Sequence, residues 1–427
     1  MDREVRRAWR TDSIRSVDGA VRSAWDVIRE AERLVRNDDV LGLKDLLNSL
    51  EPQWARVTTF LQLSIEATEE TRDDGCWQDD NSRDMSLLEH ATASGAFEVL
   101  RYLMSPWSNL EDVPRSRTIL HRAVQRGHLE MMTFLVRDKD ADLDLILESG
   151  DWELSPLAVA IESGDINIVK HLLDLGCNLQ ANCDDRSSPA VSFALREGSQ
   201  DIAQWLIDQG ASATNPDSEG RTPLHYAARA GALSLMRALL RLGADIDAGD
   251  KPYLETPLCV AAQYGQVDAM RFLLEAGAKA ERISGQCPGS PVYAVYSGFL
   301  RCGSSALDLL VAWKVDLDRM YEDKSQMCTV LSWICRYSGS RSDGIGYLVG
   351  AGADINLGDR PPVLEAWQHG TVETVEFLLR SGAEYESLHL EKVPVEDPSW
   401  DPGRGHKKVL ILQAWKEART QAGSFSG

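Results

Sequence analysis

The feature that most constrains the fold of this 427-residue chain is a segment that recurs at a nearly fixed interval. Its clearest copy is GRTPLHYAARAGALSLMRALLRLGADIDA, from Gly220 to Ala248. The next copy, ETPLCVAAQYGQVDAMRFLLEAGAKA, places Pro257 34 residues after Pro223. An earlier copy places Pro156 two periods before Pro223. Further copies begin at Ser86, Arg117, Pro189, Ser290, Thr329 and Pro361. A period of this size indicates stacked repeats rather than a single globular core.

Each copy carries the signals of two short helices joined by a turn. Thr222 has a hydroxyl that caps a helix well, and Pro223 fits the first helical turn, where a missing N–H is harmless. Gly231 supplies the left-handed residue that ends this helix, and Leu235 and Leu239 give the second helix an apolar stripe. Because one such pair cannot bury its apolar face alone, the pattern predicts a stack of pairs.

These copies resemble the ankyrin repeat family, whose unit has about 33 residues and a T-P-L-H-x-A core, matched here by residues 222–227. The resemblance implies an all-α fold, an ankyrin-repeat solenoid of about eight or nine helix-turn-helix units. It also implies that the histidines of the motif, His121 and His225, bond backbone groups of adjoining units and take no part in catalysis or metal binding.

The match is weaker at both ends of the chain. Residues 1–82 carry helical signals without a clear repeat, and we expect either a helical N-terminal capping region or a degenerate repeat. The repeat array then covers residues 83–390. Residues 391–427 contain the irregular VPVEDPSWDPGRG and the helical pattern HKKVLILQAWKEARTQ, which predict a linker and a C-terminal capping helix. Terminal units of a stack need such caps because one of their faces meets water.

Charge and cysteine usage narrow the classes of partner and compartment. Lys and Arg number 45 against 66 Asp and Glu, so the net charge is −21. An acidic surface repels phosphate, and we expect no direct contact with nucleic acid or with a membrane. The start of the chain lacks the apolar stretch of a signal peptide, and the eight cysteines lack metal or redox spacing. We therefore expect a cytoplasmic or nuclear protein without a metal or cofactor.

The candidate binding residues are those at positions of the first helix that the repeat leaves free. Aromatic and arginine side chains are enriched at protein interfaces. We predict that a partner contacts Tyr226, Arg229, Tyr264, Trp333, Arg336 and Tyr337. Glu365 takes the same kind of exposed position in the last copy, whereas Trp205 and Trp313 stand where packing leucines usually lie and are assigned to the core.

Three classes of function remain open. The first is a non-enzymatic scaffold or adaptor that binds another protein, basic or neutral in view of the acidic charge, on its concave face and turn tips. The second is an atypical enzyme or small-molecule binder that uses the aromatic concave face, in a biosynthetic pathway, although we recognise no nucleophile–base pair and no phosphate-binding loop. The third is a transcriptional regulator that acts through a DNA-bound partner. The resemblance favours the scaffold, and the oligomeric state stays open.

Overall fold

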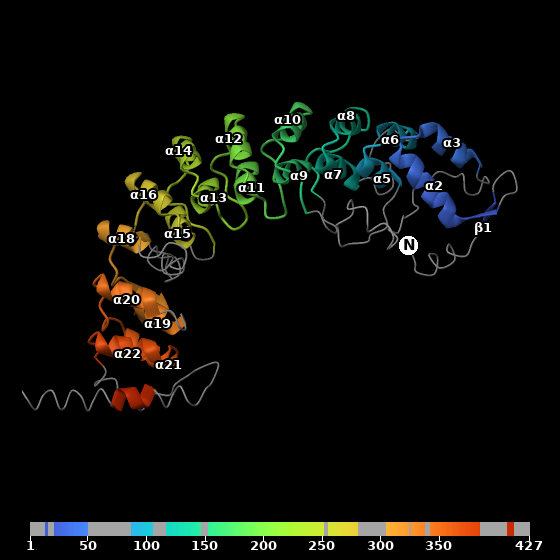
Figure 1. Cartoon of the computed structure of the whole chain (residues 1–427). Helices are drawn as coiled ribbons and strands as arrows, with labels where there is room; N and C mark the ends of the chain where they lie inside the picture. Colours follow the sequence, from blue (N-terminus) through green and yellow to red (C-terminus); the bar gives the residue numbers. More distant parts are fainter. Residues whose placement is uncertain are drawn as a thin grey trace, which may run out of the picture. The chain divides into compact units, whose positions relative to one another are not determined.

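The computed structural model describes residues 13–15, 21–49, 87–105, 117–146, 153–251, 255–280, 305–323, 326–337, 342–384 and 408–413. Contacts divide the chain into two compact units, Met1–Ser212 and Ala213–Gly427, which we describe separately. In each unit, short helices follow one another as pairs, with a first and a second helix in each pair (Figure 1). Much of the predicted N-terminal capping region and the predicted linker before residue 408 lie outside the described residues.

The first unit begins with a small hairpin and continues as helix pairs. Its elements are β1 (Ser13–Arg15), β2 (Val21–Ser23), α2 (Ala24–Arg36), α3 (Val40–Ser49), α5 (Leu87–Ser94), α6 (Phe97–Leu103), α7 (Arg117–Arg126), α8 (Leu129–Arg137), α9 (Pro156–Glu162), α10 (Ile166–Asp174), α11 (Ala190–Arg196) and α12 (Gln200–Asp208). The first helices pack in series, α5 on α7, α7 on α9 and α9 on α11.

The second unit has the same organisation. Its elements are α13 (Pro223–Ala230), α14 (Leu233–Arg241), α15 (Pro257–Gln263), α16 (Val267–Glu275), α18 (Ser305–Ala312), β3 (Met320–Asp323), β4 (Gln326–Thr329), α19 (Val330–Tyr337), α20 (Ser342–Gly350), α21 (Pro362–Gln368) and α22 (Val372–Arg380). Here α13 packs on α15 and α19 packs on α21. The fold prediction, an all-α stack of helix-turn-helix units, is confirmed.

The predicted helix signals act as expected where they are strongest. The hydroxyl of Thr256 accepts the amide hydrogen of Cys259 at 3.4 Å, and Ser155 does the same for Ala158 at 3.2 Å. Gly231 ends α13 with φ at 67°, in the left-handed region. A side chain at Gly231 would also meet the end of the Gln266 side chain, which can shift, so glycine is needed there for its left-handed conformation.

Two short antiparallel hairpins depart from the purely helical prediction. In the first unit β1 pairs with β2, and in the second β3 pairs with β4 from Met320 opposite Thr329 to Asp323 opposite Gln326. The second hairpin occupies the connection that leads into α19. Strands of three or four residues are too short to show in the helical periodicity of the sequence.

The α2–α3 pair extends the stack toward the N-terminus of the first unit. Helix α2 packs on α5 and α3 packs on α6, with Leu34 and Val35 buried. Asp38 lies between the two helices with φ at 52°, and its carboxylate accepts the Val99 amide hydrogen at 2.9 Å, near the start of α6. This pair therefore packs on the helix pair that follows it, and its assignment as a capping region or a degenerate repeat stays a prediction. The domain boundary at residue 82 falls among residues that are not described and stays a prediction.

The helical residues 408–413 pack against α21 in the second unit. The ammonium group of Lys408, 2% exposed, donates to the carbonyl oxygens of Ala366, Trp367 and Gly370. These carbonyls belong to the last turn of α21 and to the residues just after it, and the Ala366 oxygen also accepts the Gly370 amide hydrogen at 3.0 Å. A cation at a helix C-terminus is also favoured by the helix dipole.

The tryptophan predictions need a correction. Trp313 is 45% exposed, so its assignment to the core is wrong. It directly follows the last residue of α18, as the 54% exposed Leu242 directly follows α14. This position is exposed in both repeats although a large apolar residue fills it. Trp205 is half-buried, and the Lys170 ammonium lies 5.8 Å from its ring centroid.

The phasing of the repeat gives a matched pair of stability predictions on α14. Leu239 is fully buried, and Leu239→Ala should lower the free energy of unfolding by about 2–5 kcal/mol, since it leaves a cavity between stacked pairs. Leu242→Ala, three residues on, should change it by less than about 0.5 kcal/mol because Leu242 is exposed. Urea unfolding followed by circular dichroism measures both. Equal effects of the two substitutions would show that the phasing is wrong.

His90 on α5 makes the first unit sensitive to acid. Burial and the nearby Arg36 charge lower the pKa of His90 to about 4, while a hydrogen bond with the Glu32 backbone opposes the shift. A histidine whose pKa falls on folding binds protons less readily in the folded than in the unfolded state. Its contribution to stability is therefore complete above about pH 6.5 and is lost as the pH falls from there toward 4.

Lowering the pH from 7 to 5 should accordingly remove about 2 kcal/mol of stability through His90. The variant His90→Gln cannot titrate, so its own loss over the same interval should be smaller by about that amount. Urea unfolding at the two pH values measures the difference. Parallel losses in the wild type and the variant would contradict the assignment.

Candidate functional site

The first helices of the second unit carry most of the predicted binding residues. The first helices α13 and α15 lie on one side of this unit and the second helices α14 and α16 on the other (Figure 1). We call the solvent-facing side of α13, α15, α19 and α21 the first-helix surface. Arg229 and Tyr264 lie near the ends of α13 and α15, and Trp333 and Arg336 lie on α19. The Tyr337 side chain lies outside the described residues.

Arg229 and Tyr264 form a pair across two consecutive repeats. The Arg229 guanidinium lies 4.7 Å from the Tyr264 ring centroid, within the range of a cation–π contact. Arg229 is exposed and Tyr264 is half-buried. The Gln266 side-chain amide also donates to the Arg229 carbonyl oxygen at 3.1 Å. The pair is therefore held in place on the surface while its polar edge stays accessible.

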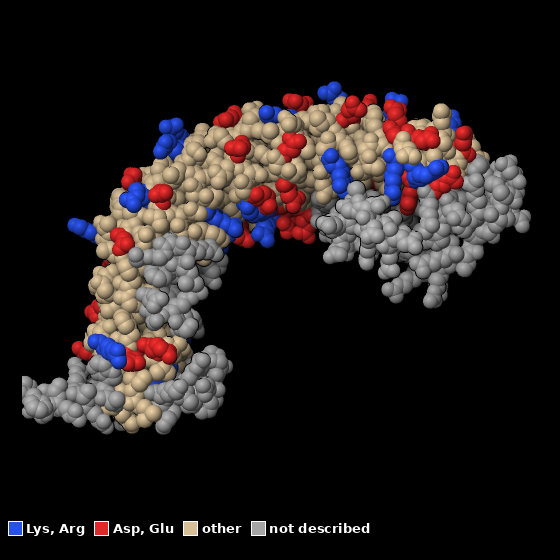
Figure 2. Space-filling view, viewed as in Figure 1, with Lys and Arg blue, Asp and Glu red and all other residues tan. Residues whose placement is uncertain are grey.

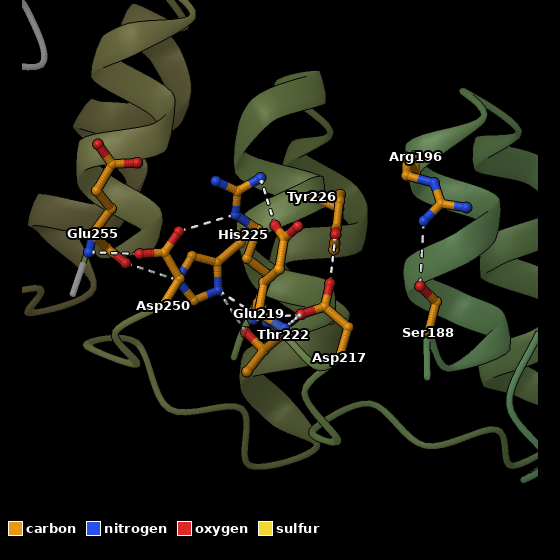
Figure 3. Close-up of polar contacts among 10 residues, drawn as sticks. Ser188, Arg196, Asp217, Glu219, Thr222, His225, Tyr226, Asp250 and Glu255 are labelled. Atoms are coloured by element: carbon orange, nitrogen blue, oxygen red, sulfur yellow. Dashed lines mark hydrogen bonds and ion pairs between the residues drawn. The ribbon is translucent and has the colours of Figure 1, made fainter. Parts of the chain in front are cut away.

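Tyr226, by contrast, is buried, and the expectation that it is exposed is wrong. Its side chain is 6% exposed, and its hydroxyl donates to the Asp217 carboxylate at 2.6 Å (Figure 3). The other Asp217 oxygen accepts the amide hydrogens of Glu219 and Arg221 at 3.0 and 2.9 Å. Tyr226 thus holds the turn that precedes α13.

A second buried carboxylate joins this turn to the next one. Asp250, 2% exposed, accepts a hydrogen bond from Arg221 Nε at 2.9 Å and another from the Glu255 amide, also at 2.9 Å (Figure 3). Burial acts to lower the pKa of Arg221, but the hydrogen bond and charge of Asp250 outweigh it and raise that pKa. Hydrogen bonds to charged groups in such semi-buried networks are stronger than neutral ones. The turns are rigid supports for the first-helix surface.

The motif histidines have the structural role that the resemblance implied. The Thr222 amide donates to His225 Nδ1 at 3.0 Å, and His225 Nε2 lies 3.0 Å from the Glu255 carbonyl oxygen of the next repeat (Figure 3). These partners require a neutral ring, and burial lowers the pKa of His225 in the same sense. In the first unit His121 Nε2 lies 2.9 Å from the Leu154 carbonyl oxygen.

Glu365 on α21 is also buried rather than exposed, which corrects a second expectation. Its carboxylate, 4% exposed, lies 2.7 Å from Arg360 Nε. Arg336 Nε and His369 Nε2 each lie 3.9 Å from its other oxygen. Arg336 therefore belongs to a charged group on α19 and α21, with half-buried Trp333 three residues before it on the same helix. We call Arg336, Arg360, Glu365 and His369 the Glu365 cluster.

The described cysteines are unsuited to nucleophilic chemistry. Cys177, Cys183, Cys259, Cys328 and Cys335 are buried free thiols. Burial raises the pKa of Cys177 to about 12 and that of Cys259 to about 11. A thiol with such a pKa is protonated at neutral pH, whereas the thiolate is the reactive form.

Metal-binding groups and membrane-spanning helices are both absent from the described residues. They contain no group of three or more His, Cys, Asp or Glu side chains placed to hold a metal ion. Of the helices in this part of the chain, none has the length and apolarity to cross a bilayer.

Comparison with family models identifies the repeats. The model for ankyrin repeats matches three overlapping stretches, residues 88–183, 157–250 and 191–284. Residues 88–284 of the chain are ankyrin repeats. Ankyrin repeats generally mediate protein–protein interactions.

The individual relatives each match only part of this chain. Ankyrin repeat protein nuc-2 of Neurospora crassa is 30% identical over 242 residues, which cover 51% of this chain and 22% of that protein. Neurogenic locus notch homolog protein 2 of Homo sapiens is 34% identical over 152 residues, or 34% of this chain and 6% of the relative. E3 ubiquitin-protein ligase KEG of Arabidopsis thaliana is 28% identical over 143 residues, or 33% of this chain and 8% of the relative. This ankyrin-repeat chain thus spans under a quarter of the length of each.

The buried carboxylates are the residues that sequence reasoning missed. Asp184, Asp217 and Asp250 recur at intervals of 33 residues, which is the repeat period. All three are buried, and Asp184 pairs with Arg196 at 2.8 Å as Asp250 pairs with Arg221. The exact recurrence of an acidic residue in a turn was the signal that could have found them.

The Tyr226–Asp217 contact distinguishes a supporting residue from a binding residue. Tyr226→Phe removes one hydrogen bond to a buried carboxylate and should lower the free energy of unfolding by about 1–3 kcal/mol. Arg229→Ala, three residues on, should change stability much less, because Arg229 is exposed. Urea unfolding of the two variants provides the measurement. A Tyr226→Phe protein as stable as the wild type would contradict the supporting role.

Proposed function

We propose that this chain is a non-enzymatic interaction scaffold or adaptor, and that a partner protein docks on the first-helix surface of its second unit. The proposed contacts come from Arg229, Tyr264, Trp333, Arg336 and Tyr337. Tyr226, the sixth residue of the original set, takes an indirect part by fixing the turn before α13. The proposed compartment is the cytoplasm or the nucleus.

The observation that carries the proposal is the Arg229–Tyr264 pair. The repeat is held by buried leucines, capping hydroxyls, motif histidines and turn carboxylates, so an exposed arginine stacked on an aromatic ring is not needed for the fold. Such a pair offers a large apolar area with several hydrogen-bond donors at small entropic cost, because the ring already restrains the guanidinium. Arginine and tyrosine are also enriched among the residues that dominate interface energetics.

The relatives support a binding role for the array as a module. Proteins named as a Notch homolog and as an E3 ubiquitin-protein ligase share it as a small part of a longer chain. A module that occurs in such different proteins is better explained by binding than by one shared reaction. Because a fold does not by itself determine function, the test must be made on the surface residues.

The test compares two arginine–aromatic pairs in the same unit. Arg229→Ala with Tyr264→Ala removes the pair on the first helices. Arg237→Ala with Phe272→Ala removes a similar pair on α14 and α16, where the guanidinium lies 5.7 Å from the ring centroid. Each control residue matches its counterpart in exposure, since Arg237 is exposed and Phe272 is half-buried. Both double variants should melt at similar temperatures.

The first double variant should capture much less of the proteins bound by the wild-type chain in affinity purification from the native cell. Loss of two interface anchors worth about 2 kcal/mol each is enough to abolish capture of a micromolar partner. The control variant should capture partners at the wild-type yield. Equal capture by the wild type and both variants would place the binding surface elsewhere.

A further inference from the structure

Helix α7 of the first unit carries two arginines whose guanidinium groups are not used within the described structure. Arg122 and Arg126 are four residues apart, which places them on the same side of the helix with Cβ atoms about 6 Å apart. Neither guanidinium forms a hydrogen bond or an ion pair with any described residue. Arg196 on α11 differs, because it lies 2.8 Å from the Asp184 carboxylate. The two arginines of α7 are therefore open to an external anion.

Arg122 stands at a position that other repeats fill with a buried apolar or aromatic side chain. It lies five residues before Gly127, which ends the first helix in the left-handed conformation. The equivalent residues, each five before such a glycine, are buried: Val159, Phe193, Tyr226 and Val260. Arg122 is half-buried, and its Nε atom is buried without a hydrogen-bond partner. Because an unpaired buried donor costs free energy, an apolar residue would serve the fold better at this position.

Arg126 is exposed in the last turn of α7, and its charge acts on its surroundings. Burial lowers the pKa of His128, and the Arg126 charge adds to this effect against a hydrogen bond with the Ala93 backbone. Acidic and basic side chains are interspersed over the described surface (Figure 2). Fields from charges beyond about 8 Å are largely screened at physiological ionic strength. A small anionic group on α7 therefore interacts chiefly with Arg122 and Arg126, although the net charge of the chain is −21.

We propose that Arg122 and Arg126 bind two carboxylate side chains of an acidic segment in a partner protein. Guanidinium groups bind carboxylates through strong, geometrically specific hydrogen bonds. In an extended segment, alternate side chains point to the same side and lie about 6–7 Å apart, which matches two arginines one helical turn apart. A nucleic acid carries charge along its whole length and would also meet the acidic side chains of the surface. The site belongs to the first unit, so it does not depend on the docking surface proposed for the second.

The probe for the test is a fluorescein-labelled peptide in which glutamates alternate with glycines, and a glutamine version is the neutral control. Fluorescence anisotropy with the full chain should show tighter binding of the glutamate peptide. Arg126→Met should weaken that binding about tenfold, as expected when one charge-assisted contact is lost. Arg137→Met is the matched control, because Arg137 is also exposed and lies in the last turn of its own helix, α8. This control should leave the affinity within about twofold.

Arg122→Met makes the test independent of folding defects. It keeps an aliphatic side chain but removes the unpaired buried donor, so it should raise the melting temperature. The same variant should weaken binding of the glutamate peptide about tenfold. A loss of affinity in a more stable protein cannot come from a damaged fold. Equal binding of the two peptides, equal losses in Arg126→Met and Arg137→Met, or unchanged affinity in Arg122→Met would each overturn the proposal. A lower melting temperature of Arg122→Met would also overturn it, because the guanidinium would then serve the fold.

Discussion

Each helix pair of this chain has two apolar faces that only a neighbouring pair can cover. Fully buried residues such as Leu224, Leu239 and Leu258 belong to different pairs or to different helices of one pair, and their burial depends on stacking. The stability of a unit is then close to a sum over adjacent interfaces, in the manner of a one-dimensional array. Everything else in the structure serves to fix the spacing of the pairs or to use the surface that stacking leaves open.

The spacing is fixed by polar groups that reach from one repeat to the next. His225 bonds the Glu255 carbonyl oxygen, and Arg221 bonds the Asp250 carboxylate. In the turns after α14 and α18, the Asp247 carboxylate accepts the Lys279 amide hydrogen at 2.9 Å, and the Asp318 carboxylate accepts that of Asp354 at 2.7 Å. Since buried polar groups must be paired, the His225 and Asp250 links favour one register between neighbouring repeats. The buried charges of the turns are thus part of the scaffold.

The fold could be predicted because its signals are local and repeated. A capping threonine, a proline and a left-handed glycine each act within one turn of chain, so Thr222, Pro223 and Gly231 could be interpreted without a structure. Burial on the first helices depends on what the next turn provides, and this the sequence does not show. Tyr226 and Glu365 occupy equivalent positions, and both are buried because a charged partner lies beside them. A tyrosine and a glutamate look like surface residues until Asp217 and Arg360 are seen.

The same limit applies to what the net charge indicates about a partner. A sum over 427 residues gives equal weight to carboxylates that are already bonded within the turns, such as Asp217 and Asp250, and to those that face solvent. What a partner meets depends on which member of each ion pair is exposed. Glu365, for example, is buried beside Arg360 and is not exposed to a partner. In a stack of repeats each turn has its own ion pairs, so the exposed member can differ from turn to turn. Neighbouring stretches of one surface can therefore accept groups of different charge.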